Sequence, residues 1–193
     1  MGVTILDEES LALGVAQRVF LSTDATVVRL LEGCFDEPIR TAGLVQKSTA
    51  ALPADAELEL TGDETILRRE TLLQGSRTGR NYVYAEASLV LDRLEPGLRE
   101  ALLSTSEPIG HLLVANRVET FRELVRAGRT PAGPLADRLD LESGEELLFR
   151  TYRVISGGQP AMLITEYFPP FFFPAPRDGN SGSGREARER LVT

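Results

Sequence analysis

The chain has very little of several residue types that mark common protein classes. It holds one cysteine, Cys34, one histidine, His111, and no tryptophan. A lone cysteine cannot form an intramolecular disulfide, which favours a cytoplasmic setting. No stretch approaches the ~20 consecutive apolar residues that a membrane-spanning helix needs. Residues 1–9 also lack the basic start and apolar run of a signal peptide, so we expect a cytoplasmic protein without a membrane partner.

The charge balance is acidic. Lysine and arginine total 21 and aspartate and glutamate total 29, which gives a net charge of −8. Nucleic acids and anionic membrane surfaces reward clustered basic side chains, so we expect neither as the main partner. A small carboxylate ligand stays compatible with this balance, because one buried arginine can bind it while the surface remains acidic.

Motifs for metal, nucleotide and covalent chemistry are missing as well. The sequence has no cluster of metal ligands and no Gly-rich phosphate loop of known spacing, so no cofactor or metal is expected. His111 follows Pro108-Ile109-Gly110, which predicts an exposed turn, and no motif places a nucleophile beside it. Cys34 falls at the end of a predicted helix, where we interpret it as a small packing residue.

Helical periodicity is confined to a few segments. Apolar spacing predicts a helix over residues 10–22, and Thr23-Asp24 is a candidate N-cap for a second helix that ends near Gly33. Pro96 at a first-turn position predicts another helix. Residues 118–125 fit either a strand or a helix, and the Gly- and Pro-rich residues 127–134 predict a connection.

Strand patterns fill most of the remaining chain. The runs 66–75 and 81–91 flank a Gly-bounded loop, and residues 39–49 alternate loosely. Gly157-Gly158 joins two β-rich runs and predicts a hairpin, because both glycines accept positive φ. The order of the expected elements along the chain, with helices first and hairpins later, predicts an α+β fold. In this fold an antiparallel sheet has helices packed on one face. We expect one domain over residues 1–176 and a polar, disordered tail over residues 177–193.

One carboxylate stands out in the last predicted strand. The strand period of two places Glu166 on a face with Met162, Ile164 and Phe168. A buried carboxylate costs several kcal/mol unless it is paired, which makes Glu166 a site candidate. The alternatives are a strand-end glutamate that reaches solvent and a structural ion pair, and the pattern alone favours these.

Two arginines compete for an inward position in the strand over residues 66–73. Arg68 and Arg69 lie on opposite faces, and each has apolar neighbours of its own parity. A buried guanidinium needs an acceptor, and a ligand carboxylate suits it because the planar fork binds it bidentately. The alternative is a surface arginine whose stem lies on apolar neighbours, and the pattern leaves open which of the two points inward.

Four short segments then occur in a set order between residues 23 and 169. They are a helix start, an arginine-bearing strand, a Pro-Gly turn and a closing strand: Thr23-Asp24-Ala25-Thr26, Leu67-Arg68-Arg69-Glu70-Thr71-Leu72-Leu73, Glu107-Pro108-Ile109-Gly110 and Gln159-Pro160 followed by Thr165-Glu166-Tyr167-Phe168-Pro169. Their order and spacing are more specific than any one of them. Together they resemble the chorismate lyase family, including its actinobacterial-type branch that forms 4-hydroxybenzoate.

This resemblance implies a fold, an activity and a set of site residues. The implied fold is an antiparallel sheet with helices on one face and the ligand sealed under two flaps. The implied reaction converts chorismate to 4-hydroxybenzoate and pyruvate, needs no cofactor or metal, and is carried out by a monomer. Arg69 would bind the ring carboxylate, and Glu166 would hydrogen-bond the ring hydroxyl and help to move a proton. Thr26 and Ile109 would supply the helix-start and flap contacts.

Some positions depart from the family pattern and keep two alternatives open. Thr26 stands where enterobacterial-type members have Met, Ile109 replaces Leu, and residues 126–146 do not match. One alternative is altered chemistry on the same scaffold, such as 3-hydroxybenzoate formation or a cyclase. The other is a non-enzymatic module that binds small carboxylates, like the effector domains of bacterial transcription regulators. Those domains normally follow a winged helix, for which the preceding residues are too few and too acidic.

Overall fold

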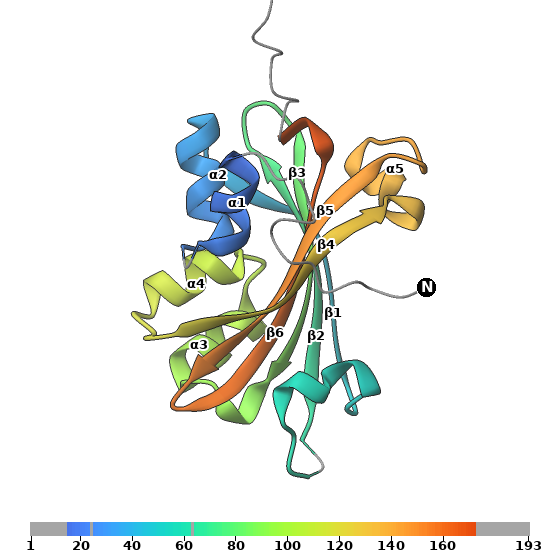
Figure 1. The fold of residues 1–193 in the computed structure, drawn as a ribbon. Helices are drawn as coiled ribbons and strands as arrows, with labels where there is room; N and C mark the ends of the chain where they lie inside the picture. The colour runs from blue at the N-terminus through green and yellow to red at the C-terminus, as the bar shows by residue number, and fades with distance from the viewer. Residues whose placement is uncertain (1–14, 24, 63, 173–193) are drawn as a thin grey trace, which may run out of the picture.

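The computed structural model describes residues 15–172 except residues 24 and 63. Its main element is a six-stranded antiparallel sheet with the strand order β1-β2-β3-β6-β5-β4 (Figure 1). The helices are α1 (Val15–Ser22), α2 (Val27–Phe35), α3 (Pro96–Ser104), α4 (Ile109–Ala115) and α5 (Ala136–Leu139). The strands are β1 (Ile39–Thr49), β2 (Ile66–Gly75), β3 (Asn81–Val90), β4 (Phe121–Pro131), β5 (Glu146–Ser156) and β6 (Gln159–Phe168). Short 3₁₀ turns are η1 (Pro53–Leu58), η2 (Leu91–Arg93), η3 (Gly133–Leu135) and η4 (Pro170–Phe172).

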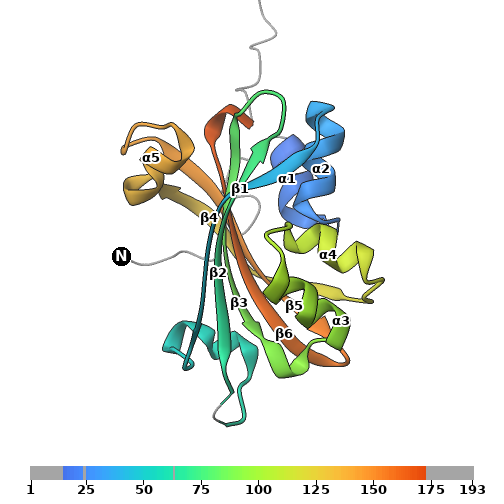
Figure 2. The same ribbon diagram turned by 180° about the vertical axis from the view of Figure 1, so that it is seen from behind.

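Helices α1 to α4 cover one face of the sheet, as Figures 1 and 2 show from opposite sides. The apolar residues between them and the sheet form two clusters, one under α1 and α2 and one under α3 and α4. The short helix α5 and η1 lie on the other side of the sheet. The predicted α+β fold with helices on one face is therefore confirmed for the four longer helices. The predicted tail lies outside the described residues, as does the start of the first predicted helix.

The Gly157-Gly158 hairpin is also confirmed. The two glycines have φ values of 57° and 79°, the left-handed region that most other residues avoid. The turn pairs Ser156 with Gln159, and a bulge between Ile155 and Val154 then shifts the register by one residue, so that Arg150 lies directly opposite Glu166.

Three local predictions were wrong. Helix α2 begins after Thr26, which has φ −67° and ψ 137°, because the Thr23 hydroxyl accepts a hydrogen bond from the Ala25 amide in a local turn. Residues 127–131 continue β4 rather than forming a connection, and Pro131 is tolerated there because β4 is an edge strand. Cys34 is exposed, because its neighbour Phe35 takes the inner position of the last turn.

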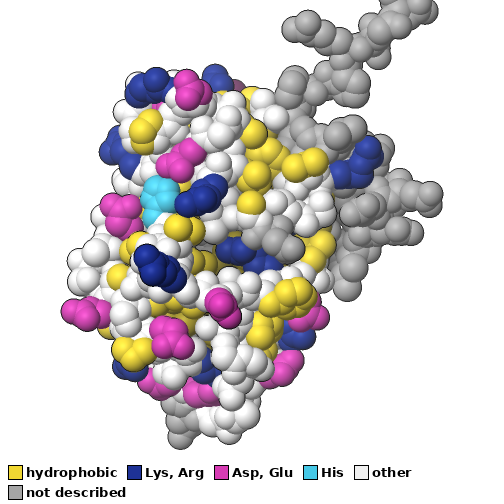
Figure 3. All heavy atoms as spheres, turned by 90° about the vertical axis from the view of Figure 1, so that its left-hand side faces the viewer, with side chains coloured by type: hydrophobic (Ala, Val, Ile, Leu, Met, Phe, Trp, Pro, Cys, Tyr) yellow, Lys and Arg dark blue, Asp and Glu magenta, His cyan; other side chains and the backbone are white. Residues whose placement is uncertain are grey.

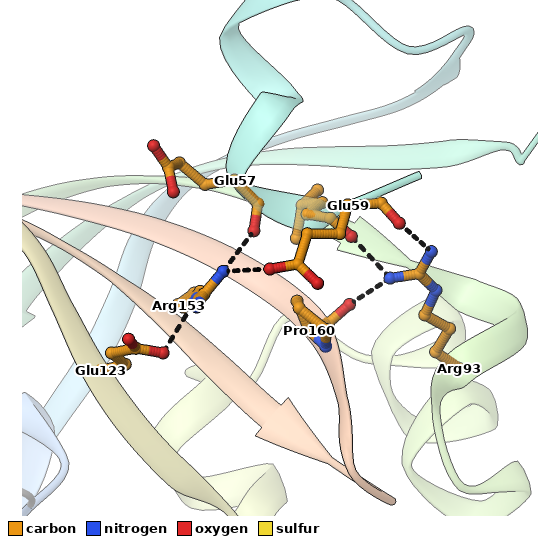
Figure 4. A network of polar contacts seen from close by, with 7 residues as sticks. Glu57, Glu59, Arg93, Glu123, Arg153 and Pro160 are labelled. Atoms are coloured by element: carbon orange, nitrogen blue, oxygen red, sulfur yellow. Dashed lines mark hydrogen bonds and ion pairs between the residues drawn. The ribbon is translucent and has the colours of Figure 1, made fainter. Parts of the chain in front are cut away.

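A polar network on the face opposite the helices holds the η1 segment to the sheet (Figure 4). Arg153 on β5 donates to Glu123 at 2.7 Å and to the Glu59 carboxylate at 2.6 Å. Arg93 donates to the backbone carbonyls of Glu59 at 3.1 Å and Pro160 at 2.7 Å. These bonds join β4, β5, β6 and η2 to one segment, and so stabilise the sheet under the functional face. Among the described residues, no helix is long and apolar enough to span a bilayer.

A second anchor holds the β2–β3 hairpin loop. The Glu37 carboxylate accepts a hydrogen bond from the Tyr82 hydroxyl at 2.6 Å and others from the Arg77 amide and from the Thr78 amide and hydroxyl. These bonds, the one from Tyr82 first, lower the pKa of Glu37 from its ordinary 4.5 to about 2. Gly75 lies against the same carboxylate, where a Cβ atom would come within 2.3 Å of it.

The substitution Glu37→Gln is expected to reduce the acid sensitivity of folding. Because the folded pKa is lower than the unfolded one, ionised Glu37 stabilises the fold above pH 4.5 and loses that effect as the pH falls toward 2. The variant should therefore show a shallower fall of the free energy of unfolding across this window, measured by urea titration. The exposed Glu119→Gln serves as control. Equal slopes for Glu37→Gln and the wild type would contradict this assignment.

Candidate functional site

The strand register brings four charged or polar residues to the helix-covered face. Thr71 pairs with Ala85, Ala85 with Glu166, and Glu166 with Arg150. Arg69 lies two residues from Thr71 along β2, so its side chain projects from the same face of the sheet. Two strand spacings and two residues of strand rise separate the Cα atoms of Arg69 and Glu166 by roughly 12 Å. Their long side chains therefore project over the same part of the sheet.

A cavity of about 40 Å³ lies between this face and the N-terminal ends of α2 and α4. Its lining includes three of the residues singled out from the sequence, Thr26, Ile109 and Glu166, with Thr71, Arg122 and Tyr152 as further polar members. Small-ligand pockets typically enclose ~300 Å³ or more. The cavity is thus smaller than such pockets usually are, and a ring-sized ligand requires it to widen.

Glu166 is buried, with 2% of its surface exposed, and it is paired. Its Oε2 accepts a hydrogen bond from the Arg150 Nε at 2.7 Å, and its Oε1 accepts one from the Tyr152 hydroxyl at 2.8 Å. This pairing offsets the desolvation cost of a buried carboxylate on the apolar face. Burial, and then the negative charge of Glu166, raise the pKa of Tyr152, which keeps this phenol a proton donor.

Arg150 is a residue that the sequence analysis missed. Besides Glu166, it donates to the backbone carbonyls of Phe20 at 2.5 Å and Thr23 at 3.4 Å, and so joins the end of α1 to the sheet. A usable signal existed, because Arg150 has the same strand parity as Leu148, Tyr152 and Val154, all of which are buried. Strand parity therefore places Arg150 on an apolar face, as it does Glu166.

Arg69 points inward, and Arg68 lies on the other face. The Arg68 guanidinium forms an ion pair with the buried Asp55 carboxylate at 2.5 Å. Arg69 is 1% exposed, and its Nη atoms donate to the backbone carbonyls of Glu107 at 2.5 Å and Leu102 at 3.4 Å. Its Nε has no hydrogen-bond partner among the described residues. Burial lowers its pKa. Arg69 lies beside the cavity without lining it.

The cover of the cavity is formed where α2 meets α4. A Cβ atom at Gly110 would lie 2.9 Å from the Thr26 Cβ, so the two helix ends are in close contact there. The Thr26 hydroxyl is buried and has no hydrogen-bond partner within the described part of the chain. His111 lies on α4, half-buried, and its Nε2 is 3.2 Å from the Glu32 carboxylate on α2. The predicted exposed turn at His111 was wrong, because Pro108 is the N-cap of a helix.

A second cavity, of about 110 Å³, adjoins the first. Its lining is more polar and consists of Leu21, Ser22, Thr23, Arg122, Leu124, Arg150 and Tyr152. Arg122 and Tyr152 line both cavities. Figure 3 views the molecule from the side of α1 to α4, and shows basic side chains set among hydrophobic ones near the middle of that side. Within the described part of the chain, no three His, Cys, Asp or Glu side chains cluster as a metal site requires.

Sequence comparison finds relatives over nearly the whole described chain. A family model described as "Chorismate pyruvate-lyase Rv2949c-like" matches residues 21–174. A chorismate pyruvate-lyase of Mycobacterium leprae is 34% identical over 167 residues, which cover 86% of this chain and 79% of the relative. One from Mycobacterium tuberculosis is 31% identical and covers 84% of this chain and 83% of the relative.

Comparison with solved structures finds the same fold in transcription regulators. YydK of Bacillus subtilis, described as a possible transcriptional regulator, superposes with a TM-score of 0.58 at 18% identity, over 71% of this chain and 60% of YydK. PhnF of Mycobacterium smegmatis gives a TM-score of 0.59 at 12% identity, over 77% of this chain and 65% of PhnF. At these identities the likeness establishes the fold alone.

Removing one partner of the buried ion pair is expected to destabilise the fold strongly. Arg150→Met leaves the Glu166 charge buried without its countercharge, which should lower the free energy of unfolding by about 3–5 kcal/mol. The double variant Arg150→Met/Glu166→Leu should be more stable than Arg150→Met, because no buried charge remains. Arg129→Met, which breaks an exposed pair with Glu146, should cost about 0–1 kcal/mol. Urea unfolding measures all of these; a double variant that is less stable than Arg150→Met would contradict the assignment.

Gly110→Ala tests the contact between α2 and α4. The added methyl group would lie 2.9 Å from the Thr26 Cβ and should push the two helix ends apart, at a cost of about 1–3 kcal/mol. Thr26→Gly removes that contact and costs little itself at an N-cap, so the double variant should recover most of the loss. Thermal unfolding gives the comparison. No recovery in the double variant would show that the strain arises elsewhere.

Proposed function

The chain belongs to the Rv2949c-like chorismate pyruvate-lyase family, and from that premise we propose that it eliminates pyruvate from chorismate to give 4-hydroxybenzoate. It is thus a carbon–oxygen lyase. The observation that best supports the site is the buried Glu166, which lines a small cavity under α4 with the buried Arg69 beside it. Fold likeness to regulators does not favour a binding module, because the identity to the lyases is about twice as high.

The reaction is an elimination that yields an aromatic ring. The ether bond between the ring and the enolpyruvyl oxygen breaks, and the bonding electron pair leaves with that oxygen. The ring carbon that bears the hydroxyl loses its hydrogen as a proton, and protonation of the enolpyruvate methylene gives pyruvate. No oxidant is required, and aromatisation supplies the driving force. The protein needs mainly to fix the ring and exclude water.

Arg69 is proposed to bind the ring carboxylate. Its guanidinium is buried and positively charged, and its present acceptors are neutral backbone carbonyls. A carboxylate forms stronger, bidentate bonds with the same fork. One of those carbonyls, at Glu107, lies just before α4, so the movement of the cover that admits a ring also releases Arg69. Arg69 thereby joins the cavity in the bound state.

Glu166 is proposed to bind the ring hydroxyl at the other end of the ligand. Arg150 and Tyr152 fix both of its oxygens, so its lone pairs are oriented before the substrate arrives. A hydrogen bond to the hydroxyl orients the neighbouring carbon–hydrogen bond and lets Glu166 help to move the proton. Thr26 and Ile109 complete the wall, where the buried Thr26 hydroxyl offers a further hydrogen bond.

The setting of the enzyme is proposed as well. We propose a cytoplasmic monomer without a nucleic-acid or membrane partner. The single cysteine supports the cytoplasmic setting, and the net charge of −8 supports the expected lack of a nucleic-acid or membrane partner. The monomeric state is proposed from the family resemblance alone.

The activity is tested by incubating the purified protein with chorismate. Pyruvate, followed by a coupled assay, and 4-hydroxybenzoate, followed by liquid chromatography, should form in equal amounts. Arg69→Gln should lower kcat/KM by about 10²–10³-fold, because it removes a buried charge partner worth a few kcal/mol. Arg68→Gln, on the opposite face of the same strand, is the matched control and should leave kcat/KM of the folded protein unchanged. Absence of turnover by the wild type, or a different aromatic product, would refute the proposal.

A further inference from the structure

Gln46 is the side chain that lies beside Arg69 in the sheet. Gln46 on β1 pairs directly with Arg69 on β2. Residues that lie opposite one another in antiparallel strands project from the same face, so both side chains reach toward the helices. Gln46 is half-buried there and lines neither of the two cavities. It is therefore placed to act on Arg69 rather than on the ring of a ligand.

The two side chains share one hydrogen-bond acceptor. The Gln46 Nε2 and the Arg69 Nη1 each donate to the backbone carbonyl of Leu102, both at 3.4 Å. Leu102 lies in the last turn of α3, where the final carbonyls have no partner within the helix. Both bonds are long, so one donor can leave while the other keeps this carbonyl satisfied.

Each side chain also carries a buried polar atom that has no hydrogen-bond partner among the residues that the structure describes. For Gln46 this atom is Oε1, an acceptor, and for Arg69 it is Nε, a donor. An unpaired polar atom in a protein interior is costly, and more so when it belongs to a charged group. The two atoms are complementary and belong to neighbouring side chains, so a small rearrangement of these side chains can pair them.

The binding of a carboxylate to Arg69 is a rearrangement of this kind. In the proposed function, the Arg69 Nη atoms leave the carbonyls of Leu102 and Glu107 and bind the ring carboxylate. A carboxylate that binds end-on uses both Nη atoms, which leaves the Nε for another acceptor. The Leu102 carbonyl is then left to the Gln46 Nε2 alone, and the amide held by this bond presents its Oε1 toward Arg69.

We propose that Gln46 is a positioning residue for Arg69. Its amide takes over the Leu102 carbonyl and accepts a hydrogen bond from the Arg69 Nε when the ring carboxylate binds. This inference rests on the proposed function. The amide orients the guanidinium without neutralising it, whereas a carboxylate in its place would pair with Arg69 and compete with the ligand.

Gln46→Met removes both hydrogen-bonding groups and keeps a side chain of similar length. It should raise the KM for chorismate and the inhibition constant of 4-hydroxybenzoate by about 10-fold each, because an oriented bond to a charged group is lost. The kcat should stay unchanged, since this bond acts equally on bound substrate and transition state. The unfolding temperature of the ligand-free variant should be equal to that of the wild type or higher, because an unpaired buried acceptor is gone. A glutamine with a merely structural role would lower it.

Two further variants and a control keep the test decisive. Gln46→Glu keeps the shape and adds a charge beside Arg69, so it should weaken both ligands by about 100-fold. In an Arg69→Gln background, Gln46→Met should have no further effect on the inhibition constant, because Gln46 acts through Arg69. Val45→Met, one residue away on the opposite face and 47% exposed, should match the wild type in every constant.

The outcomes separate this inference from the proposed function. Unchanged constants in both Gln46→Met and Gln46→Glu would overturn the inference, and so would an equal effect of Gln46→Met with and without Arg69. A wild type without turnover would refute the proposed function itself. Calorimetric titration with 4-hydroxybenzoate compares the same variants without turnover, so the two failures are distinguishable. A wild type that does not bind 4-hydroxybenzoate would overturn both.

Discussion

The buried ion pair between Arg150 and Glu166 is the interaction on which the rest of the site depends. It lets a carboxylate remain on an apolar sheet face, because the Arg150 charge and the Tyr152 hydroxyl satisfy both of its oxygens. The same arginine holds the carbonyls at the end of α1 and in the following loop, so the position of the N-terminal helices is coupled to the site. One residue thus orients the carboxylate and anchors part of the cover.

The second constraint on the site is the tight contact between helices α2 and α4. Helices α2 and α4 meet so tightly at Thr26 and Gly110 that only a small space remains above the sheet. With the two helices in contact, the Arg69 guanidinium donates hydrogen bonds to the backbone carbonyls of Leu102 and Glu107 near α4. In the proposed function, opening of the contact between α2 and α4 would make room for a ring and would let Arg69 exchange these neutral acceptors for the proposed carboxylate. This coupling favours a bound state that is closed and dry, as an elimination that must exclude water requires.

Much of this could be predicted from the sequence, and the failures have physical reasons. The Gly-Gly hairpin and the strand periods depend on local backbone rules, and they predicted the sheet correctly. Strand parity placed Glu166 among apolar residues but could not choose between Arg68 and Arg69, because both have apolar neighbours. That choice follows from the pairing of Arg68 with Asp55, a contact between distant segments. Arg122, which also lines the cavity, has no distinctive pattern in the sequence because it is a half-exposed arginine on an edge strand.

The most direct test of the central claim is a crystal structure with 4-hydroxybenzoate bound. We expect the ring to lie in the cavity under α4, with its hydroxyl within hydrogen-bond distance of Glu166. Its carboxylate should lie on Arg69, with the Glu107 carbonyl displaced. The Arg150–Glu166 pair should remain intact. A carboxylate bound to Arg122 or Arg150, or a ring outside this cavity, would contradict the account.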